Sequence, residues 1–347
     1  MANRRGILPV LAAALVAAAG ACAAPGPRHP SELPPLAPDT VFPRCSRADL
    51  AVAGYPDHMH AWVWTDWVPP TGDDGLPYGP GAFCDDQTLI PRPGLIVGED
   101  EQRFGPFVLR HNPGYTPCDM LHFLELVDFA HRRLGPLLGV AAPDTLVLVN
   151  PDNNDHYRQT AGVGTWRLYR RLGEATIVQP IGTLQARTLD GHAAFMIVAD
   201  WLLARGVSDE LPPWLHHGLV EYLAEDGVHL NNYMAQFRPA GSPLFSPPIV
   251  DAILGGEPDA DPGRDREMFR RASYSAFLMA WELVENRGGL DALREFLELV
   301  AAGTPLDEAS RRVYGLDMAE LTRSVDPVEL GEPIGTAVDP RRPHVQP

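Results

Sequence analysis

The chain has 347 residues, of which 45% are apolar and 21% are charged, and its formal net charge is −17. This apolar fraction is typical of a globular protein and excludes disorder throughout the chain. Because 45 acidic residues outnumber 28 basic ones, the composition argues against a nucleic-acid-binding protein, which needs a basic face. The 36 prolines and 32 glycines are too many for a simple helical bundle.

The first 21 residues are typical of a signal peptide. Arg4 and Arg5 precede an apolar run over residues 7–19, which is short for a helix that spans a bilayer. The following sequence Ala19-Gly20-Ala21-Cys22 resembles a bacterial lipobox, although Ala19 stands where Leu is usual. This resemblance implies a cell-envelope lipoprotein outside the cytoplasm, anchored to the membrane through lipidated Cys22. Cleavage without lipidation would instead give a secreted or periplasmic protein.

Two regions are expected between the signal peptide and the main domain. Residues 22–43 are proline-rich and lack apolar periodicity, which predicts a semi-rigid spacer. Residues 44–103 are expected to be loop-rich, with Trp62 and Trp64 on one face of a strand. These two rings form either a small aromatic core or a contact surface for a ligand. Export permits one disulfide here, and we prefer Cys45–Cys84 because it would staple the loop-rich stretch between them.

Regular structure is expected from residue 104 to residue 325. A helix is predicted to begin at Pro117, with Thr116 as its N-cap, and to end at Gly135 or Gly139. Apolar runs predict strands over residues 107–109, 145–149 and 175–178. Helices are then expected over residues 188–205, 213–225, 249–254, 267–286 and 290–302, with a short one from residue 306 to Gly315. The proline-rich residues 326–347 are predicted to be a disordered tail.

The residues with the most chemical potential lie between residues 190 and 226. His217 and Glu221 are four residues apart, so both face the same side of the expected helix. His192 lies on the preceding helix and could reach the same cleft. Two imidazoles and one carboxylate would be an acceptable set of zinc ligands if they converged.

Residues 104–325 resemble the gluzincin class of zinc metallopeptidases, the peptidase MA-like proteins. In that class one helix carries His-Glu-x-x-His, and a second helix, Trp-Leu-x-Glu-Gly-x-Ala-Glu-Tyr, provides the third metal ligand through its first Glu. Residues 214–222, Trp-Leu-His-His-Gly-Leu-Val-Glu-Tyr, follow the second pattern except that His217 replaces this Glu. The resemblance implies an α+β fold: a small mixed sheet followed by a mainly helical gluzincin-like domain, behind the loop-rich N-terminal region.

The first helix of this resemblance departs from the family pattern at two positions. When His192 is aligned with the first ligand, Ala193 occupies the position of the catalytic Glu and Met196 that of the second His. Peptide hydrolysis in this class needs a metal to activate water and a Glu to accept the proton. Alanine cannot accept a proton, and methionine is a poor zinc ligand. The degenerate motif therefore leaves no intact set of catalytic residues.

Three hypotheses remain open, and we expect the first. In the first, the protein is a pseudoenzyme without a cofactor that acts in binding or structure, and His192 and Met196 belong to the core. In the second, it is a metal-dependent hydrolase with the altered ligands His192, His217 and Glu221, or with Asp200 among them, and Glu221 acts as the base. In the third, it is an extracytoplasmic protein that binds a peptide or glycan through its tryptophan-rich region. The partner would be an unknown protein or peptide, and no nucleic acid is expected.

Overall fold

The computed structural model describes residues 84–85, 88–89, 94–113, 115, 117–139, 145–187, 189–224, 244–256 and 262–330. Cys22, Cys45, Trp62 and Trp64 lie outside these ranges. The signal peptide, the spacer, the tryptophan-containing region and the tail therefore remain predictions. In the described part of the chain, no helix combines the length and the apolar character that crossing a membrane requires.

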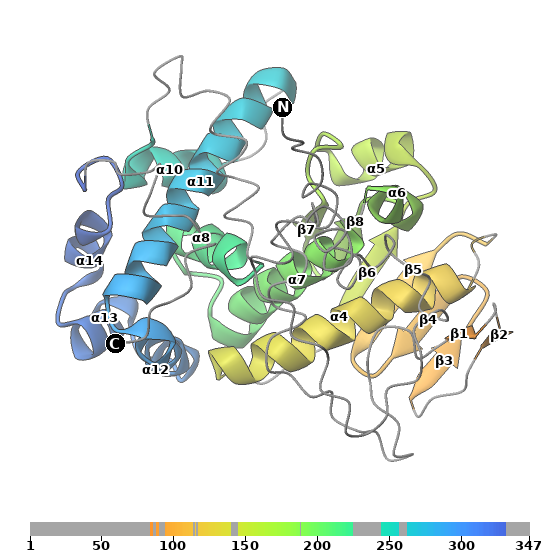
Figure 1. Cartoon of the computed structure of the whole chain (residues 1–347), viewed down its shortest axis with the longest axis horizontal. Coiled ribbons are helices and arrows are strands. Elements are labelled where there is room, and N and C mark those ends of the chain that lie inside the picture. Colours follow the sequence, from red (N-terminus) through yellow and green to blue (C-terminus); the bar gives the residue numbers. More distant parts are fainter. Residues whose placement is uncertain are drawn as a thin grey trace, which may run out of the picture.

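A mixed six-stranded sheet forms one side of the molecule, and helices make up most of the remainder (Figure 1). The strand order is β3-β4-β5-β6-β8-β7; the central strands β5, β6 and β8 are parallel, and the outer strands pair antiparallel. The strands are β3 (Leu95–Val97), β4 (Glu101–Phe104), β5 (Phe107–His111), β6 (Leu146–Asn150), β7 (Tyr169–Leu172) and β8 (Ala175–Val178). This arrangement is an α+β fold. The sheet begins at residue 95, before the domain boundary that we expected at residue 104.

Helix α4 (Pro117–Leu138) connects the parallel strands β5 and β6. It begins at the proline that the sequence predicts and ends at Gly139, whose φ of 68° is a left-handed conformation that favours glycine. Gly135, the alternative end, lies inside the helix. The helix buries Leu121, Leu124 and Leu134 in the main core. In Figure 1 it lies across the sheet and alongside α7.

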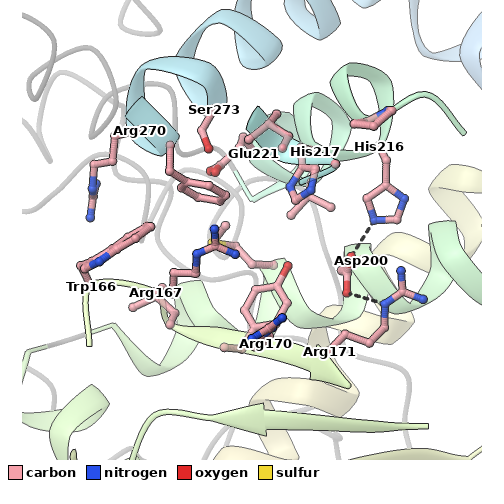
Figure 2. Close-up of a pocket in the computed structure, with 18 of the residues that line it drawn as sticks. Trp166, Arg167, Arg170, Arg171, Asp200, His216, His217, Glu221, Arg270 and Ser273 are labelled. Atoms are coloured by element: carbon pink, nitrogen blue, oxygen red, sulfur yellow. Dashed lines mark hydrogen bonds and ion pairs between the residues drawn. The ribbon is translucent and has the colours of Figure 1, made fainter. Parts of the chain in front are cut away.

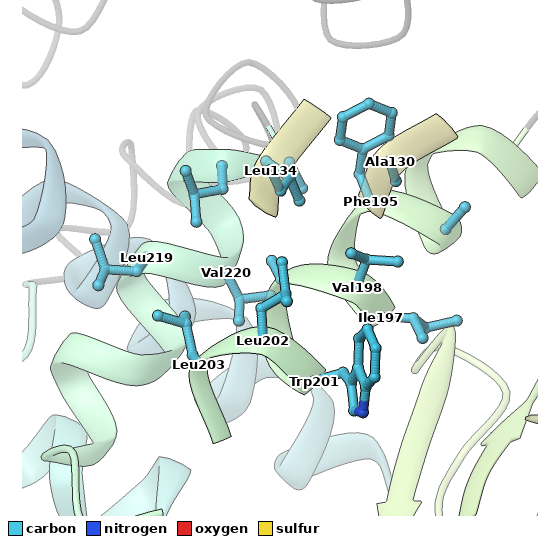
Figure 3. Packing of buried hydrophobic residues seen from close by; sticks show 14 of the residues in the cluster. Ala130, Leu134, Phe195, Ile197, Val198, Trp201, Leu202, Leu203, Leu219 and Val220 are labelled. Atoms are coloured by element: carbon cyan, nitrogen blue, oxygen red, sulfur yellow. The ribbon is translucent and has the colours of Figure 1, made fainter. Parts of the chain in front are cut away.

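Three consecutive helical segments form the centre of the molecule. Helix α7 (Asp190–Trp201) continues directly into a π-helical segment, η2 (Leu202–Val207), and α8 (Pro213–Leu223) comes next. Figure 3 shows Phe195, Val198 and Trp201 packed among apolar side chains from α4 and α8. The indole of Trp201 meets the ring of Phe107 edge-on at a centroid distance of 6.0 Å, which ties α7 to the sheet.

Five helices follow α8 in the described part of the chain, and the first two of them pack against α8 (Figure 1). They are α10 (Pro247–Leu254), α11 (Pro262–Asn286), α12 (Gly289–Ala301), α13 (Leu306–Tyr314) and α14 (Met318–Ser324). Helix α11 approaches α8 at Gly218, where a Cβ atom would lie only 2.3 Å from the carbonyl oxygen of Ala276. Only glycine permits this separation. The expected end of α13 at Gly315 is confirmed by its φ of 74°.

Several elements were not predicted from the sequence. They are the strands β1 (Cys84–Asp85), β2 (Thr88–Leu89), β3, β4 and β7 and the helices α5 (Asn154–Ala161), α6 (Ile181–Ala186) and α14. Helix α5 has only two buried residues, and every residue of β7 is at least partly exposed. Neither element therefore has the apolar periodicity that identifies a buried face.

Cys118 is buried and disulfide-bonded, and its partner is outside the described side chains. A single bond between Cys45 and Cys84, the pair preferred from the sequence, would leave Cys118 as a thiol. Cys118 is not that remaining thiol. The side chains of Cys45 and Cys84 are not described, so their pairing stays a prediction.

Candidate functional site

A cavity of about 340 Å³ lies where several parts of the chain meet. Its main walls are residues 166–171, which include most of the edge strand β7, and the facing sides of α7, α8 and α11; Arg187, Asp209 and residues 254–256 also line it (Figure 2). The three candidate ligands from the sequence, His192, His217 and Glu221, all line it. The prediction that the two helices bring these residues to one cleft is therefore confirmed.

Helix α7 presents one continuous face to the cavity. His192, Met196 and Asp200 follow one another at intervals of four residues, and all three line the cavity. Met196 was expected to be a core residue in the pseudoenzyme hypothesis; it is partly buried and packs against the main core, and it also lines the cavity. Ala193 is completely buried in the main hydrophobic core. Its methyl group provides no proton acceptor.

Helix α8 is held in place by contacts at its start and in its middle. Pro212 has no side chain that could cap the helix, and the carboxylate of Asp251 on α10 accepts a hydrogen bond from the backbone N–H of Trp214 at 2.8 Å instead. Gly218 allows α11 to pack against the middle of the helix. These contacts fix the side of α8 that carries His217 and Glu221.

A buried polar network crosses one end of the cavity. The Nε2 atom of His216 lies 2.6 Å from Oδ1 of Asp200, and the guanidinium of Arg171 lies 3.4 Å from the other carboxylate oxygen. Burial alone would raise the pKa of Asp200, but His216 and Arg171 hold it below its usual value. Arg171 also binds Asp209 at 2.9 Å. Asp200 is therefore an ionised partner of two side chains.

His216 and His217 both line the cavity, with ring centroids 5.7 Å apart. Consecutive residues of a helix diverge by about 100°, so the two side chains leave α8 in different directions. The cavity extends around the first turns of α8, so it reaches both rings. His216 is committed to Asp200, whereas His217 packs edge-on against Phe269 at 6.2 Å.

The environment of His217 keeps its imidazole neutral. Burial lowers the pKa of this histidine to about 3, and the positive charges of Arg167 and Arg171 contribute to the decrease. A neutral imidazole can bind a metal, so the protonation state of His217 does not exclude a metal ligand.

The positions of the other donors do not fit a zinc ion. Among the residues that the structure describes, no three His, Cys, Asp or Glu side chains are arranged so that they could hold a metal ion. Asp200 and His216 bind each other at 2.6 Å. His192, His217 and Glu221 thus share a cavity without forming a metal centre in this arrangement.

Most of the charge in the cavity was not predicted from the sequence. Among the residues that the structure describes, five arginines line the cavity, and the carboxylates that line it are those of Asp200, Asp209 and Glu221. The arginines are Arg167, Arg170, Arg171, Arg187 and Arg270. Three of the five lie within residues 167–171, and this local concentration in an acidic chain was the available signal. The other two arginines come from distant segments, so no local sequence pattern indicates that they reach the cavity.

No protein-family model and no curated protein matches this chain.

Proposed function

We propose that this protein is an exported, lipid-anchored gluzincin-like protein without peptidase activity, and that it binds a ligand in the cavity between β7, α7, α8 and α11. The observation that carries the proposal is the charge of this cavity: among the described residues, five arginines line the cavity in which the resemblance would put a metal ion. Guanidinium groups repel a divalent cation, and in a partly buried site water screens this repulsion poorly.

The order of elements supports the gluzincin-like part of the proposal. Strands and a helix precede α7, and α7 and α8 stand at a shared cavity with His192 on one and His217 on the other. The spacing of His192 and Met196 on the cavity face of α7 is the spacing of the two histidines in His-Glu-x-x-His. The alignment of the degenerate motif is consistent with this placement.

The absence of peptidase activity is supported by the side chains themselves. The position of the general base holds Ala193, which is buried and cannot accept a proton. The position of the second metal ligand holds Met196, a weak ligand for zinc. An acid–base candidate that could replace it, Glu221, lines the cavity from α8.

A second candidate function is favoured by one observation: His192, His217 and Glu221 line the same cavity. An altered hydrolase would need these side chains to converge on a metal, with Glu221 as the base that activates water. The described donors do not form such a group, and we therefore rank this function second.

A hydrolysis assay separates the two candidates. The purified protein is incubated with a fluorogenic peptide library, once with added zinc and once with a chelator. We expect turnover no greater than that of the Glu221→Gln variant under both conditions. Turnover that is abolished by the chelator and by Glu221→Gln, but retained in Glu308→Gln, would overturn the proposal. Glu308 is a suitable control because it is exposed on α13.

A further inference from the structure

We propose that the Trp166 end of the cavity binds the phosphate group of a small ligand, with Arg167, Arg187 and Arg270 supplying the positive charge. This inference rests on the proposed function, because it assigns a ligand class to the same cavity. Figure 2 shows Trp166, Arg167 and Arg270 at one end of the cavity and the Asp200, His216 and Arg171 network at the other.

Arg167 is held in a fixed position by two aromatic rings. Its guanidinium carbon lies 3.9 Å from the centroid of the Phe269 ring and 5.1 Å from that of Trp166. Its backbone carbonyl accepts hydrogen bonds from the Tyr157 hydroxyl at 2.9 Å and from the Gln179 side chain at 2.8 Å. A guanidinium held by stacking loses little freedom when it binds an oxyanion, so its donors are preorganised.

Gln179 joins Arg187 to the same structure. This glutamine is completely buried, and its amide group donates to the carbonyls of Thr165 and Arg167. Its carbonyl oxygen accepts a hydrogen bond from Arg187 at 3.2 Å. One buried side chain thus sets the position of Arg187 relative to Arg167.

The cations gather closely enough to influence one another. Burial lowers the pKa of the Arg187 guanidinium, and the charges of Arg270 and Arg266 lower it further. Like charges repel, so a fold that collects them in a cavity places them where an anion offsets the repulsion. Arg171 lies at the opposite end of the cavity, where Asp200 and Asp209 both pair with it. Arg170 is directed elsewhere and donates to the carbonyl of Ala161 at 2.7 Å.

A hydroxyl group adds a further donor to the three arginines of the proposed phosphate site. Ser273 lies one turn after Arg270 on α11, lines the cavity and is 1% exposed. Within the described part of the chain its Oγ atom has no hydrogen-bond partner. Buried hydroxyls without partners are uncommon in folded proteins, and an oxygen atom of a bound anion would satisfy this one.

The number of charges favours phosphate over carboxylate. A phosphate monoester carries a charge of about −1.5 to −2 at neutral pH and three strong acceptor oxygens, whereas a carboxylate carries a single charge and two oxygens. Three guanidinium groups and a hydroxyl match the larger charge and the greater number of acceptors. The cavity volume of about 340 Å³ suits a small molecule, which Met196, Leu189 and Leu254 would contact on the apolar wall.

Calorimetric titration with inorganic phosphate tests the inference. The full-length purified protein is titrated at pH 7.5, with sodium chloride at the same ionic strength as the reference and sodium acetate as the carboxylate probe. We expect one phosphate per chain, bound about tenfold or more tightly than acetate. Heats for phosphate equal to those for chloride would overturn the inference, and acetate binding as tight as phosphate would overturn the assignment to phosphate.

Substitutions locate the site. We expect Arg270→Gln and Arg187→Gln each to weaken phosphate binding by about tenfold or more, because each removes a charged donor. Arg270→Lys should recover part of the affinity, since lysine keeps the charge without the two-pronged geometry. Arg294→Gln on α12, which is 44% exposed and does not line the cavity, serves as the control.

Thermal melts without ligand establish that each variant is folded. The two arginine variants lie on different elements, so misfolding of one leaves the other as a test. Unchanged phosphate affinity in a folded variant would overturn the inference. If phosphate fails to bind and peptides are not hydrolysed, this inference alone fails; peptide hydrolysis that needs Glu221 overturns the proposed function instead.

Discussion

The ion pair at the start of α7 makes the stability of the protein depend on pH in a defined window. The Nε2 atom of His122 on α4 lies 3.3 Å from a carboxylate oxygen of Asp190, the first residue of α7, and Glu125 is 3.9 Å from the other ring nitrogen. Burial alone would lower the pKa of His122, but the two carboxylates outweigh it and raise the pKa to about 9. Removing this charged histidine should therefore destabilise the folded protein.

The sign and size of the contribution of His122 to the unfolding free energy follow from the difference between its folded and unfolded pKa values. A histidine in the unfolded chain has a pKa of about 6.5, so the folded state binds the proton more tightly. Its contribution is fully present below pH 6.5 and is lost as the pH rises towards 9. At about 1.4 kcal/mol per pH unit, the largest contribution is roughly 3 kcal/mol.

Urea unfolding of the wild type and His122→Gln, followed by circular dichroism, measures this contribution. The difference in unfolding free energy between the two proteins should decrease by roughly 3 kcal/mol from pH 6 to pH 9. His156→Gln is the control, because His156 lies on α5 with 44% of its side chain exposed. A difference that stays constant to within about 0.5 kcal/mol across this range would refute the reasoning.

Three further predictions concern the elements around the cavity. Gly218→Ala should lower the unfolding free energy by about 1–3 kcal/mol, because the added methyl group would collide with the backbone of α11. In the same urea assay the control Gly182→Ala on α6, which has nothing within 4 Å of its Cβ position, should leave the unfolding free energy unchanged or raise it by up to about 1 kcal/mol. Asp251→Ala should lower the unfolding free energy by about 1–3 kcal/mol, because the Trp214 N–H loses its acceptor. Asp251→Asn keeps an acceptor and should lose less stability. Equal decreases in the two variants would contradict the role of this hydrogen bond. Asn153→Ala should cost about 1 kcal/mol, because the Asn153 side chain accepts hydrogen bonds from the Asp155 and His156 N–H groups at the start of α5; a midpoint of urea unfolding identical to that of the wild type would show that this cap is dispensable.

The limits of a helix could be predicted wherever a proline or glycine at that position favours its start or end. Pro117 starts α4 and Gly139 ends it, and Gly315 ends α13 in the same left-handed conformation. Each of these residues acts through its own backbone preferences. Strand β7 had no such signal, because it lies at the edge of the sheet and its residues are not buried in alternation.

The candidate site could be predicted only in part for the same reason. His217 and Glu221 are four residues apart on α8, so their shared face follows from helical periodicity, whereas the position of His192 at the same cavity depends on the packing of α7 against α8. Arg187 and Arg270 are separated by 83 positions along the chain and meet only through the packing of α11 over the cavity. The pairing of Asp200 with His216 likewise depends on how α7 and α8 are placed relative to one another.

The zinc content of the purified protein tests the central claim most directly. The protein is prepared without chelators, and zinc per chain is measured by plasma mass spectrometry for the wild type, His192→Ala, His217→Ala and the control His156→Ala. A cavity dominated by guanidinium groups predicts far less than one zinc per chain, with no difference among the four proteins. One zinc per chain in the wild type and the control, lost in both His192→Ala and His217→Ala, would contradict the account.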